Sequence, residues 1–571
     1  MRTHTCGELS EKHLNKEATL CGWVKAIRNH GGLIFLDLWD RYGMTQVVID
    51  PAHDKTLHSA CLEIGKEWVI QVQGKVRKRK AGQAYEKLST GKIEVLADTV
   101  VIITKAEPLP LDDSATEETR LKYRYLDIRK TRLPNLTFRS RVVLAAREHF
   151  HKHGFIDIDT PMLVKSTPEG ARDYVVPSRI NPGKFYALPQ SPQLYKQILM
   201  IAGVDKYYQV AKCLRDEDLR QDRQPEHTQL DFEMSFVEQK DIRVFVESLY
   251  KHIFKEVLGV ALTSFPVFSY KDAMNRYGSD KPDIRFGLEL TDITNLAKQT
   301  DFSIFKNAEA VKCICPHKTF SRGEVDSYTE LAKNHGAKGL VYAKVASGKL
   351  ESSISKYISE AIQKEIIKKT GAKDGSSIMI IADTWKKTCQ ALGQLRNKLA
   401  EDLKLITKDF QFAWVNDFPL FSYNEDEKHW EPEHHMFSMP KKEFIADFEK
   451  RPGEVIGDLW DVCLNGMELG SGSIRVYDPA LQERIMNFIG IDKKQANEKF
   501  GFLLEAYKYG APVHGGMGLG FDRLVALMLG TKDIREVIAF PKNKNAECPM
   551  DGSPSHISEQ QMKELHLGIK K

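Results

Sequence analysis

The chain has 571 residues, of which 42% are hydrophobic and 28% charged, and its net charge is +5. This length exceeds what a single hydrophobic core supports, so we expect about three domains. The small net charge argues against a protein that only coats nucleic acid, and it restricts any RNA contact to a local basic patch.

The N-terminal residues, Met1 to Thr5, contain no apolar segment typical of a signal peptide, and no run of 18 apolar residues occurs. We therefore expect a cytoplasmic protein with no membrane contact. The nine cysteines are scattered without a paired CxxC motif. This spacing favours reduced thiols over a zinc site.

Residues 1–106 contain five short segments in which apolar and polar residues alternate, separated by turn residues: 19–24, 32–38, 45–49, 69–76 and 93–96. Five strands in so short a region predict a small β-barrel. A short helix is expected at 62–67, between the third and fourth strands. That order suits an OB-fold, which commonly binds oligonucleotides through one face and its loops.

A linker is predicted at 107–130, because Pro108 and Pro110 disfavour regular structure at its start. Residues 135–153 then predict an amphipathic helix with Val142, Val143, Ala146 and Phe150 on one face and a C-terminal stop at Gly154. We assign 131–285 to the first part of a larger core domain.

The lysine-rich region 286–408 contains few concentrated motifs and is interpreted as an inserted domain. The strand-rich pattern resumes in 409–550, which we assign to the second part of the core. Residues 551–571 are expected to form a peripheral tail.

The strongest motif lies between Cys213 and Glu233, where a predicted strand, a charged loop and a second strand follow one another. Arg215 and Glu217 are expected on one face of the first strand. Gln229, Asp231 and Glu233 alternate onto one face of the second. Such residues are poor strand formers and costly to bury unpaired, so the pattern favours a binding site over a solvated hairpin.

Two weaker motifs accompany it. Glycine-rich residues 515–520 lead to Arg523 at the start of an apolar helix, and a helix N-terminus of this kind favours anions. The pattern is not a Walker loop, because GxxxxGK[ST] is absent. Residues 155–163 alternate like a strand that ends at Pro161.

These three stretches, in this order and spacing, resemble the signature motifs of class II aminoacyl-tRNA synthetases. Residues 167–174, 187–196 and 278–283, together with the insert, are similar to aspartyl-tRNA synthetases of the bacterial type. The resemblance implies an α+β fold with an N-terminal OB-fold β-barrel, a class II antiparallel sheet core flanked by helices, and an inserted α/β domain. It also implies a homodimer, with the strand before Pro161 at its interface.

The reaction implied by this resemblance starts with aspartate and ATP, proceeds through aspartyl-adenylate with release of pyrophosphate, and ends with transfer to the 3′ end of tRNA(Asp). Such chemistry needs positioning and charge neutralisation more than a covalent nucleophile. The resemblance implies catalytic roles for Arg215, Glu217 and Arg523. His227 occupies the adenine-stacking position, where the family usually has phenylalanine. The resemblance also predicts the ATP-binding residues, which are Arg215, Asp216, Glu217, Gln224, His227, Glu468, Gly520, Phe521, Asp522 and Arg523. It predicts that Asp461 and Glu468 bind Mg²⁺.

The aspartate pocket implied by the resemblance contains Glu169, Ser191, Gln193, Lys196, Arg215, Asp231, His434 and Arg475. Lys196 and Arg475 are expected to face the substrate's side chain. Asp231 and Glu169 are expected to receive its ammonium group. Asparagine would leave the two cations uncompensated, so discrimination by charge should be strong without editing.

The predicted barrel carries residues that match the family's anticodon contacts, Arg28, Phe35, Gln46 and Glu94, and a basic run at 77–80 suited to phosphates. His30 and Gly82 are similar to the residues of relatives that charge both tRNA(Asp) and tRNA(Asn). Relatives restricted to tRNA(Asp) usually have leucine at the position of His30.

Three alternatives remain open. An asparaginyl- or lysyl-tRNA synthetase is disfavoured by the insert and by Gln193, Lys196 and Arg475. A non-catalytic RNA-binding paralogue is disfavoured because the motif arginines and both candidate magnesium acids are present. An asparagine synthetase on the same core would lack the barrel.

Overall fold

The computed structural model describes residues 1–80, 82–167 and 171–569. The chain forms two compact units, one containing residues 1–134 and 548–553, the other residues 135–547 and 554–571. Among the described residues, no helix has both the length and the apolar character needed to cross a membrane.

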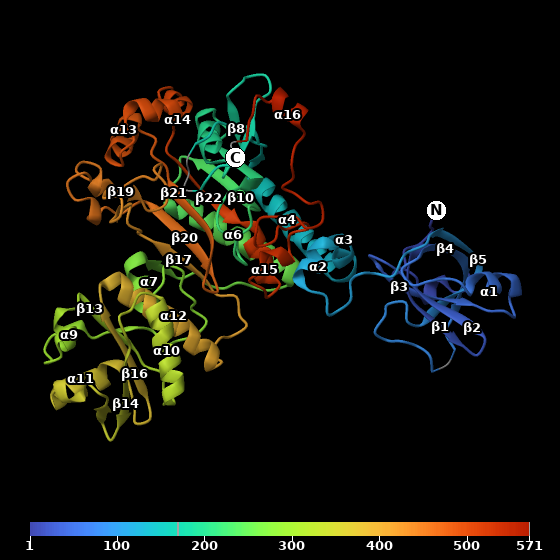
Figure 1. Cartoon of the computed structure of the whole chain (residues 1–571), viewed down its shortest axis with the longest axis horizontal. Coiled ribbons are helices and arrows are strands. Elements are labelled where there is room, and N and C mark those ends of the chain that lie inside the picture. Colours follow the sequence, from blue (N-terminus) through green and yellow to red (C-terminus); the bar gives the residue numbers. More distant parts are fainter. Residues whose placement is uncertain (81, 168–170, 570–571) are drawn as a thin grey trace. The chain divides into compact units, whose positions relative to one another are not determined.

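The first unit contains a closed barrel with the strand order β1-β2-β3-β5-β4, which confirms the predicted OB-fold topology (Figure 1). Its strands are β1 (Glu17–His30), β2 (Leu33–Asp40), β3 (Gly43–Ile49), β4 (Val69–Lys78) and β5 (Ile93–Thr104). Alternate residues such as Leu20, Val24, Leu36 and Val72 are fully buried inside the barrel. Because successive strand residues point to opposite sides, the intervening residues face outward.

The helix between β3 and β4 is α1 (Lys55–Cys61), so the prediction of a helix at 62–67 is wrong. The side chain of Asp54 accepts a hydrogen bond from the backbone N–H of Leu57 and starts the helix at Lys55, seven residues earlier than predicted. An N-cap aspartate of this kind fixes a helix start more strongly than apolar spacing does.

Helices α2 (Glu117–Lys122) and α3 (Arg124–Asp127) follow the irregular proline-containing segment. The long helix α4 (Leu133–Lys152) then confirms the predicted amphipathic helix, with Val142, Ala146 and Phe150 fully buried. It ends before Gly154, whose φ of +79° is a conformation that glycine adopts without strain.

The second unit is built around an eight-stranded sheet with the order β11-β17-β20-β21-β22-β10-β9-β6. Its pairs are antiparallel except β11–β17 and β6–β9. Helices α4, α6 and α15 pack their apolar side chains against this sheet in one hydrophobic core. The strands are β6 (Ile156–Asp157), β9 (Lys206–Leu214), β10 (Glu226–Ser235), β11 (Val267–Ser269), β17 (Phe412–Asn416), β20 (Leu459–Leu464), β21 (Met467–Ile474) and β22 (His514–Gly520), and the helices α6 (Gln239–Leu258) and α15 (Phe521–Met528).

The predicted strand at 155–163 is much shorter than expected. Only Ile156 and Asp157 pair with β9, and the chain is irregular from there to Pro161. Alternation of apolar residues alone therefore overestimated this strand, because it does not report whether a partner strand continues alongside.

The inserted region contains a five-stranded sheet with the order β12-β13-β16-β14-β15. Helices α10 and α12 cover the face of β16 that presents Met379 and Ile381, whereas α8, α9 and α11 cover the face of Ile378 and Ile380 (Figure 1). The elements are β12 (Thr291–Asp292), α8 (Thr294–Ala297), α9 (Ser303–Asn307), β13 (Ala310–Ile314), α10 (Arg322–Asn334), β14 (Val341–Ala346), β15 (Lys349–Glu351), α11 (Glu360–Thr370), β16 (Ser377–Asp383) and α12 (Trp385–Asp402).

The predicted α/β character of this insert is corrected in one respect, since its strand pairs are antiparallel. The short turn at Ser347 and Gly348 joins β14 and β15 as a hairpin, which only antiparallel strands allow.

The strands and α-helices of the chain not yet named are β7 (Val175–Pro177), β8 (Phe185–Ala187), α5 (Gln193–Ile201), α7 (Tyr270–Tyr277), β18 (Phe421–Asn424), β19 (His429–Pro432), α13 (Pro479–Phe488), α14 (Lys493–Tyr507) and α16 (Glu559–Glu564).

Candidate functional site

Strands β10 and β22 form the floor of the site. On β10, Leu230 and Phe232 face the hydrophobic core. Gln229, Asp231 and Glu233 lie opposite glycines of β22, as the alternation predicted. A Cβ atom on Gly516 would lie 2.3 Å from Glu233 Oε2, and one on Gly518 would lie 3.2 Å from Gln229 Oε1. The glycines of the third motif therefore leave room for the polar row of the second.

Four buried charges form what we call the paired-charge cluster: Lys196, Asp231, Glu233 and Arg475. Lys196 Nζ lies 2.8 Å from Asp231 Oδ1 and 3.4 Å from Glu233 Oε2. Arg475 donates from Nε and Nη2 to the two oxygens of Glu233, at 2.8 and 3.2 Å. Burial alone would raise the pKa of Glu233, but Arg475 and Lys196 lower it below its ordinary value.

This arrangement changes the expected basis of selectivity. The two cations are not uncompensated, because Glu233 lies between them and every side chain of the cluster is at most 2% exposed. All five N–H groups of Arg475 have partners, namely Glu233, His435, Ser473 and the backbone oxygen of Gly516. A ligand can therefore accept a hydrogen bond from Arg475 only by displacing one of these partners.

His435, rather than His434, contacts Arg475, with Nε2 of the imidazole 2.8 Å from Nη1. Burial and the positive charge of Arg475 hold the pKa of His435 well below its ordinary value, so the ring is neutral and accepts from the guanidinium. The neighbouring His434 lies 3.4 Å from Asp461, which raises its pKa despite burial. Sequence reasoning chose one histidine of an adjacent pair and missed the other.

Two buried polar atoms beside the cluster lack a hydrogen-bond partner among the described residues, Asp231 Oδ2 and Gln193 Nε2. Buried polar groups are normally satisfied, so an acceptor and a donor of this kind mark a place for a polar ligand. Ser191 lies next to them, and its hydroxyl accepts from the backbone N–H of Gln193. The predicted contact from Glu169 lies outside the described residues.

A cleft of about 190 Å³ adjoins the cluster, and we call it the nucleotide cleft after the ligand that the sequence predicts for its lining residues. Eight of the ten predicted ATP residues line it: Arg215, Glu217, Gln224, His227, Glu468, Gly520, Asp522 and Arg523. Of the other two, Phe521 packs in the hydrophobic core and is 1% exposed. Asp216 pairs with Arg172 at 4.0 Å.

Arg215 and Glu217 do not lie on a strand face, so that prediction is wrong. Strand β9 ends at Leu214, and both residues belong to the loop that leads to β10. One further backbone bond joins the N–H of Arg215 to the oxygen of Pro225 before the two segments separate. Because Pro225 has no N–H, it cannot return a ladder bond at this point. Arg215 and Glu217 therefore lie in a loop, from which their side chains line the cleft.

Arg523 enters the cleft from the first turn of α15. Its Nη1 donates to the backbone oxygen of Glu468 at 2.5 Å, and Nη2 donates to Asp222 at 3.3 Å. Its neighbour Asp522 accepts from the backbone N–H of Thr228 at 2.7 Å and pairs with Arg139 of α4. Asp522 therefore braces α15 against β10 and α4, which fixes where Arg523 points.

The imidazole of His227 lines the same cleft. Burial, followed by the positive charges of Arg215 and Arg523, lowers its pKa to about 3. The ring is thus neutral at physiological pH and offers an aromatic face, as phenylalanine would at this position.

Glu468 on β21 lines the cleft, and Asp461 lies on the neighbouring strand β20. Asp461 is 1% exposed, and its Oδ1 accepts no hydrogen bond from the described residues. Burial and the nearby charge of Glu468 raise the pKa of Asp461, while Lys281, 3.3 Å from Glu468, helps to lower that of Glu468. A buried and a partly exposed carboxylate that repel each other fit a hard divalent cation such as Mg²⁺.

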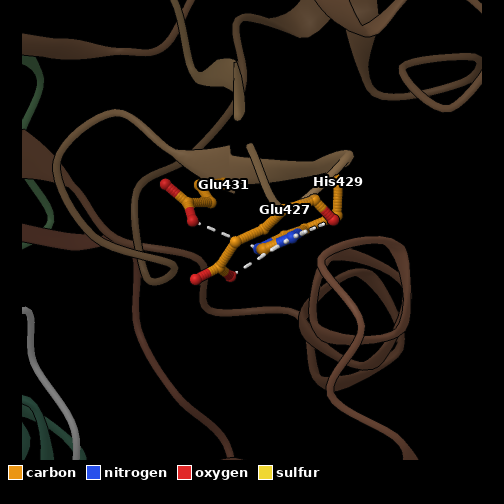
Figure 2. A group of neighbouring side chains, drawn as sticks. All are labelled: Glu427, His429 and Glu431. Atoms are coloured by element: carbon orange, nitrogen blue, oxygen red, sulfur yellow. Dashed lines mark hydrogen bonds and ion pairs between the residues drawn. The ribbon is translucent and has the colours of Figure 1, made fainter. Parts of the chain in front are cut away.

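A different group of possible ligands lies on the hairpin of β18 and β19, where His429 is placed between Glu427 and Glu431 (Figure 2). The imidazole nitrogens are 3.7 and 3.2 Å from the two carboxylates. These are ordinary surface contacts between a histidine and two acids on a partly exposed hairpin, and we assign no ion to them.

The barrel presents the predicted anticodon residues on adjoining strands. Arg28 donates to both oxygens of Asp37, at 2.6 and 2.7 Å, and Phe35 lies directly opposite it on β2. Gln46 donates to Glu94 at 2.8 Å. His30 is exposed at the end of β1, and Gly82 adopts a φ of +79° in an exposed loop.

Comparison with known proteins gives two family matches. Residues 116–544 match tRNA synthetases class II (D, K and N), and residues 18–103 match the OB-fold nucleic acid binding domain. Each of the three curated relatives that follow aligns over this entire chain and carries the name aspartate–tRNA(Asp/Asn) ligase. That of Caldanaerobacter subterraneus is 47% identical over 98% of its own length, that of Dictyoglomus turgidum 46% over 98%, and that of Aquifex aeolicus 46% over 98%.

Two solved structures show a similar fold. The asparaginyl-tRNA synthetase of Pyrococcus horikoshii, complexed with asparaginyl-adenylate, aligns over 94% of this chain and 97% of its own, with 20% identity and a TM-score of 0.59. The aspartyl-tRNA synthetase of Entamoeba histolytica aligns over 94% and 91%, with 18% identity and a TM-score of 0.57.

Proposed function

The chain belongs to the class II tRNA synthetases of the D, K and N group, and we propose that it is an aspartate–tRNA ligase that charges both tRNA(Asp) and tRNA(Asn). The observation that carries the choice of amino acid is the paired-charge cluster, which offers two buried cations beside an unsatisfied carboxylate oxygen of Asp231. That combination suits a small ligand with one ammonium and two carboxylate groups.

In this proposal, the ammonium group of aspartate donates to Asp231 Oδ2, which lacks a partner among the described residues. The side-chain carboxylate approaches Lys196 and Arg475. Because His435 is a neutral acceptor, it holds the guanidinium less firmly than Glu233 does. The substrate's anionic oxygen therefore displaces the His435 contact at little cost.

The same geometry explains rejection of asparagine. Its amide brings no negative charge to the two cations, and its NH₂ group would face donors. Because every N–H of Arg475 already has a partner, asparagine would break the bond to His435 without supplying a charge-assisted bond in return. A site built around a charged partner discriminates strongly against such an analogue. We therefore propose that no editing site is required.

ATP occupies the nucleotide cleft in this proposal. Arg215 holds the α-phosphate against the α-carboxylate of aspartate, which attacks the phosphorus while pyrophosphate leaves. Arg523 binds the γ-phosphate, and the neutral ring of His227 stacks on adenine. Glu217 and Gln224 hold the nucleotide from the loop after β9.

Asp461 and Glu468 are the residues suited to hold Mg²⁺. When bound, the ion supplies charge neutralisation of the phosphate oxygens. The protein's own part is to keep the two acids fixed by neighbouring strands, with His434 beside Asp461 and Lys281 beside Glu468.

The tRNA anticodon binds the outer face of the barrel in this proposal, with Phe35 stacking on a base and the basic run at 77–80 contacting phosphates. The choice of both tRNAs rests on the relatives' names and on His30 and Gly82. Both positions are exposed, and a Cβ on Gly82 would meet no atom within 4 Å. The loop therefore has room for a second anticodon base at this position.

We also infer a cytoplasmic homodimer. Strand β6 ends the large sheet, and the large apolar side chains of Leu144, Ile156 and Leu163 in and near it are each more than half exposed. Burying them against a second copy would remove apolar surface from water. Sedimentation velocity of the wild type should give the dimer mass, and Ile156→Glu should give the monomer mass; a monomeric wild type would contradict the inference.

The test of the function is aminoacylation of purified tRNA(Asp) and tRNA(Asn) transcripts with labelled aspartate. Charging of both at comparable kcat/KM supports the proposal. A His30→Leu variant should then retain tRNA(Asp) and lose tRNA(Asn) selectively. Charging of tRNA(Asp) alone would overturn the dual specificity, and charging with asparagine or lysine would overturn the choice of amino acid.

A further inference from the structure

The loop of residues 278–283 lies between the catalytic sheet and the inserted region. It follows α7 and begins at Gly278, whose φ is +69°. Lys281, within it, extends toward the nucleotide cleft, where its Nζ lies 3.3 Å from Glu468 Oε2. The loop thus delivers a cation to one of the two acids suited to Mg²⁺.

Helix α12 of the inserted region contacts the start of this loop backbone to backbone. A Cβ on Gly278 would lie 2.3 Å from the oxygen of Cys389 and 2.6 Å from the Cα of Gly393. A Cβ on Gly393 would in turn lie 2.3 Å from the oxygen of Gly278. Neither position accepts a side chain without a shift of the loop or the helix, although glycine in a helix interior is otherwise unfavourable.

Arg396, one turn further along α12, holds the other end of the loop. Its Nη2 donates to the backbone oxygens of Asp283, Phe286 and Gly287, at 3.0, 2.8 and 2.8 Å. Its guanidinium carbon lies 4.0 Å from the centre of the Phe286 ring. Burial lowers the pKa of Arg396 to about 10, so it remains charged at neutral pH. A buried charge with three backbone acceptors fixes this segment firmly.

The opposite side of the loop packs on the strands that carry the two acids. The thiol of Cys463 on β20 donates to the oxygen of Asp280 at 3.9 Å. A Cβ on Gly466, in the turn between β20 and β21, would lie 3.0 Å from the Cβ of Asp283. The loop is therefore held between α12 and the β20–β21 hairpin, and its position depends on both.

We propose that helix α12 is a positioning element of the nucleotide site, and that it holds the 278–283 loop so that the Lys281 ammonium neutralises Glu468 until a divalent cation arrives with ATP. This rests on the proposed function of the cleft. Lys281 is a positioning residue: an ammonium at 3.3 Å keeps the two repelling acids in place and competes with a free metal ion for Glu468. The inserted region thereby acts on the chemistry without touching substrate.

The test measures Mn²⁺ binding to the nucleotide-free full chain by electron paramagnetic resonance. Lys281→Met should tighten binding about tenfold, because the competing charge is removed, and Lys281→Arg should restore the wild-type affinity. Gly393→Ala should tighten it by about threefold, and should add nothing in a Lys281→Met background, since coupled residues are not additive. Gly323→Ala in α10 is the matched control, because a Cβ there meets no atom within 4 Å.

Unchanged Mn²⁺ affinity in Lys281→Met overturns the proposal, and so does a Gly393→Ala effect that persists in full without Lys281. Should Gly393→Ala fail to fold, Arg396→Lys replaces it in the cycle, because it keeps the charge but cannot reach all three oxygens. Aspartate-dependent ATP–pyrophosphate exchange by the wild type is measured on the same preparation. Its absence would overturn the function of the cleft, which the Mn²⁺ cycle does not decide.

Discussion

The paired-charge cluster and the nucleotide cleft adjoin each other, yet they differ in how far their charged side chains are buried. In the cluster every charged side chain is at most 2% exposed and has an opposite charge within 3.4 Å. In the cleft, Arg523 and Asp222 are 24% and 35% exposed and 3.3 Å apart. Removing one partner of a buried ion pair lowers the stability of the protein strongly, whereas an exposed ion pair contributes little to stability. The cluster should therefore couple selectivity to stability, and the cleft should affect catalysis alone.

The largest effect is expected for Glu233→Gln. This change leaves Lys196 and Arg475 with one buried carboxylate between them, and the unfolding free energy should fall by about 3–5 kcal/mol. Aspartate-dependent exchange should be lost as well. Urea unfolding of the two proteins measures the difference. Asp222→Asn is the matched control from the cleft and should change stability by less than about 1 kcal/mol; equal losses would erase the contrast between the two regions.

Arg523→Ala should show the opposite profile. Removing a cation aimed at phosphate charge should lower kcat for ATP–pyrophosphate exchange by about 10²–10³-fold. The urea midpoint should barely move, because the guanidinium is partly solvated. Steady-state exchange and unfolding on the same sample check this. A loss of stability like that of Glu233→Gln would mean that the cleft is as structural as the cluster.

Phe35→Ala should distinguish the role of the barrel, which is tRNA binding, from the roles of the cluster and the cleft. Loss of one base–aromatic stack costs about 1–3 kcal/mol, so kcat/KM for tRNA should fall by roughly 5- to 150-fold. Exchange in the absence of tRNA should stay at the wild-type level. An equal decrease in exchange would show that Phe35 acts on the fold rather than on the anticodon.

The smallest effect is expected for His227→Phe. With a pKa of about 3, the imidazole is neutral between pH 6 and 9, so KM for ATP should depend on pH alike in both proteins. An unfolded histidine titrates near 6.5. The lowered pKa therefore removes stability as the pH falls from 6.5 toward 3, and the variant should lose less. Urea midpoints at pH 7.5 and 5 test this; a larger loss in the variant would contradict a neutral ring.

Local periodicity was enough to predict the barrel, helix α4 and the alternation of Gln229, Asp231 and Glu233, because each depends on residues close in sequence. The partner of Glu233 was not predictable in this way, since Arg475 lies 242 residues away. The contact between Asp522 and Arg139 spans 383 residues. Sequence patterns describe faces of elements, and only the fold determines which faces meet.

The family resemblance did not predict the contacts of two further residues, His435 and Lys281. The sequence predicted His434 because it matched the family pocket, yet it is His435, in the irregular segment after β19, whose imidazole contacts Arg475. Lys281 lay in a recognised motif without a role, since its contact with Glu468 depends on packing between α12 and the β20–β21 hairpin. The shortened β6 and the loop position of Arg215 likewise depend on where partner strands end.

The central claim is that the paired-charge cluster selects a ligand by its second carboxylate. Aspartate-dependent ATP–pyrophosphate exchange in the absence of tRNA tests it most directly, with asparagine, lysine and glutamate as competitors. The account predicts exchange with aspartate and a kcat/KM for asparagine lower by about 10⁴-fold. Exchange with asparagine within tenfold of that with aspartate would contradict it, because the buried cations would then have no part in the choice.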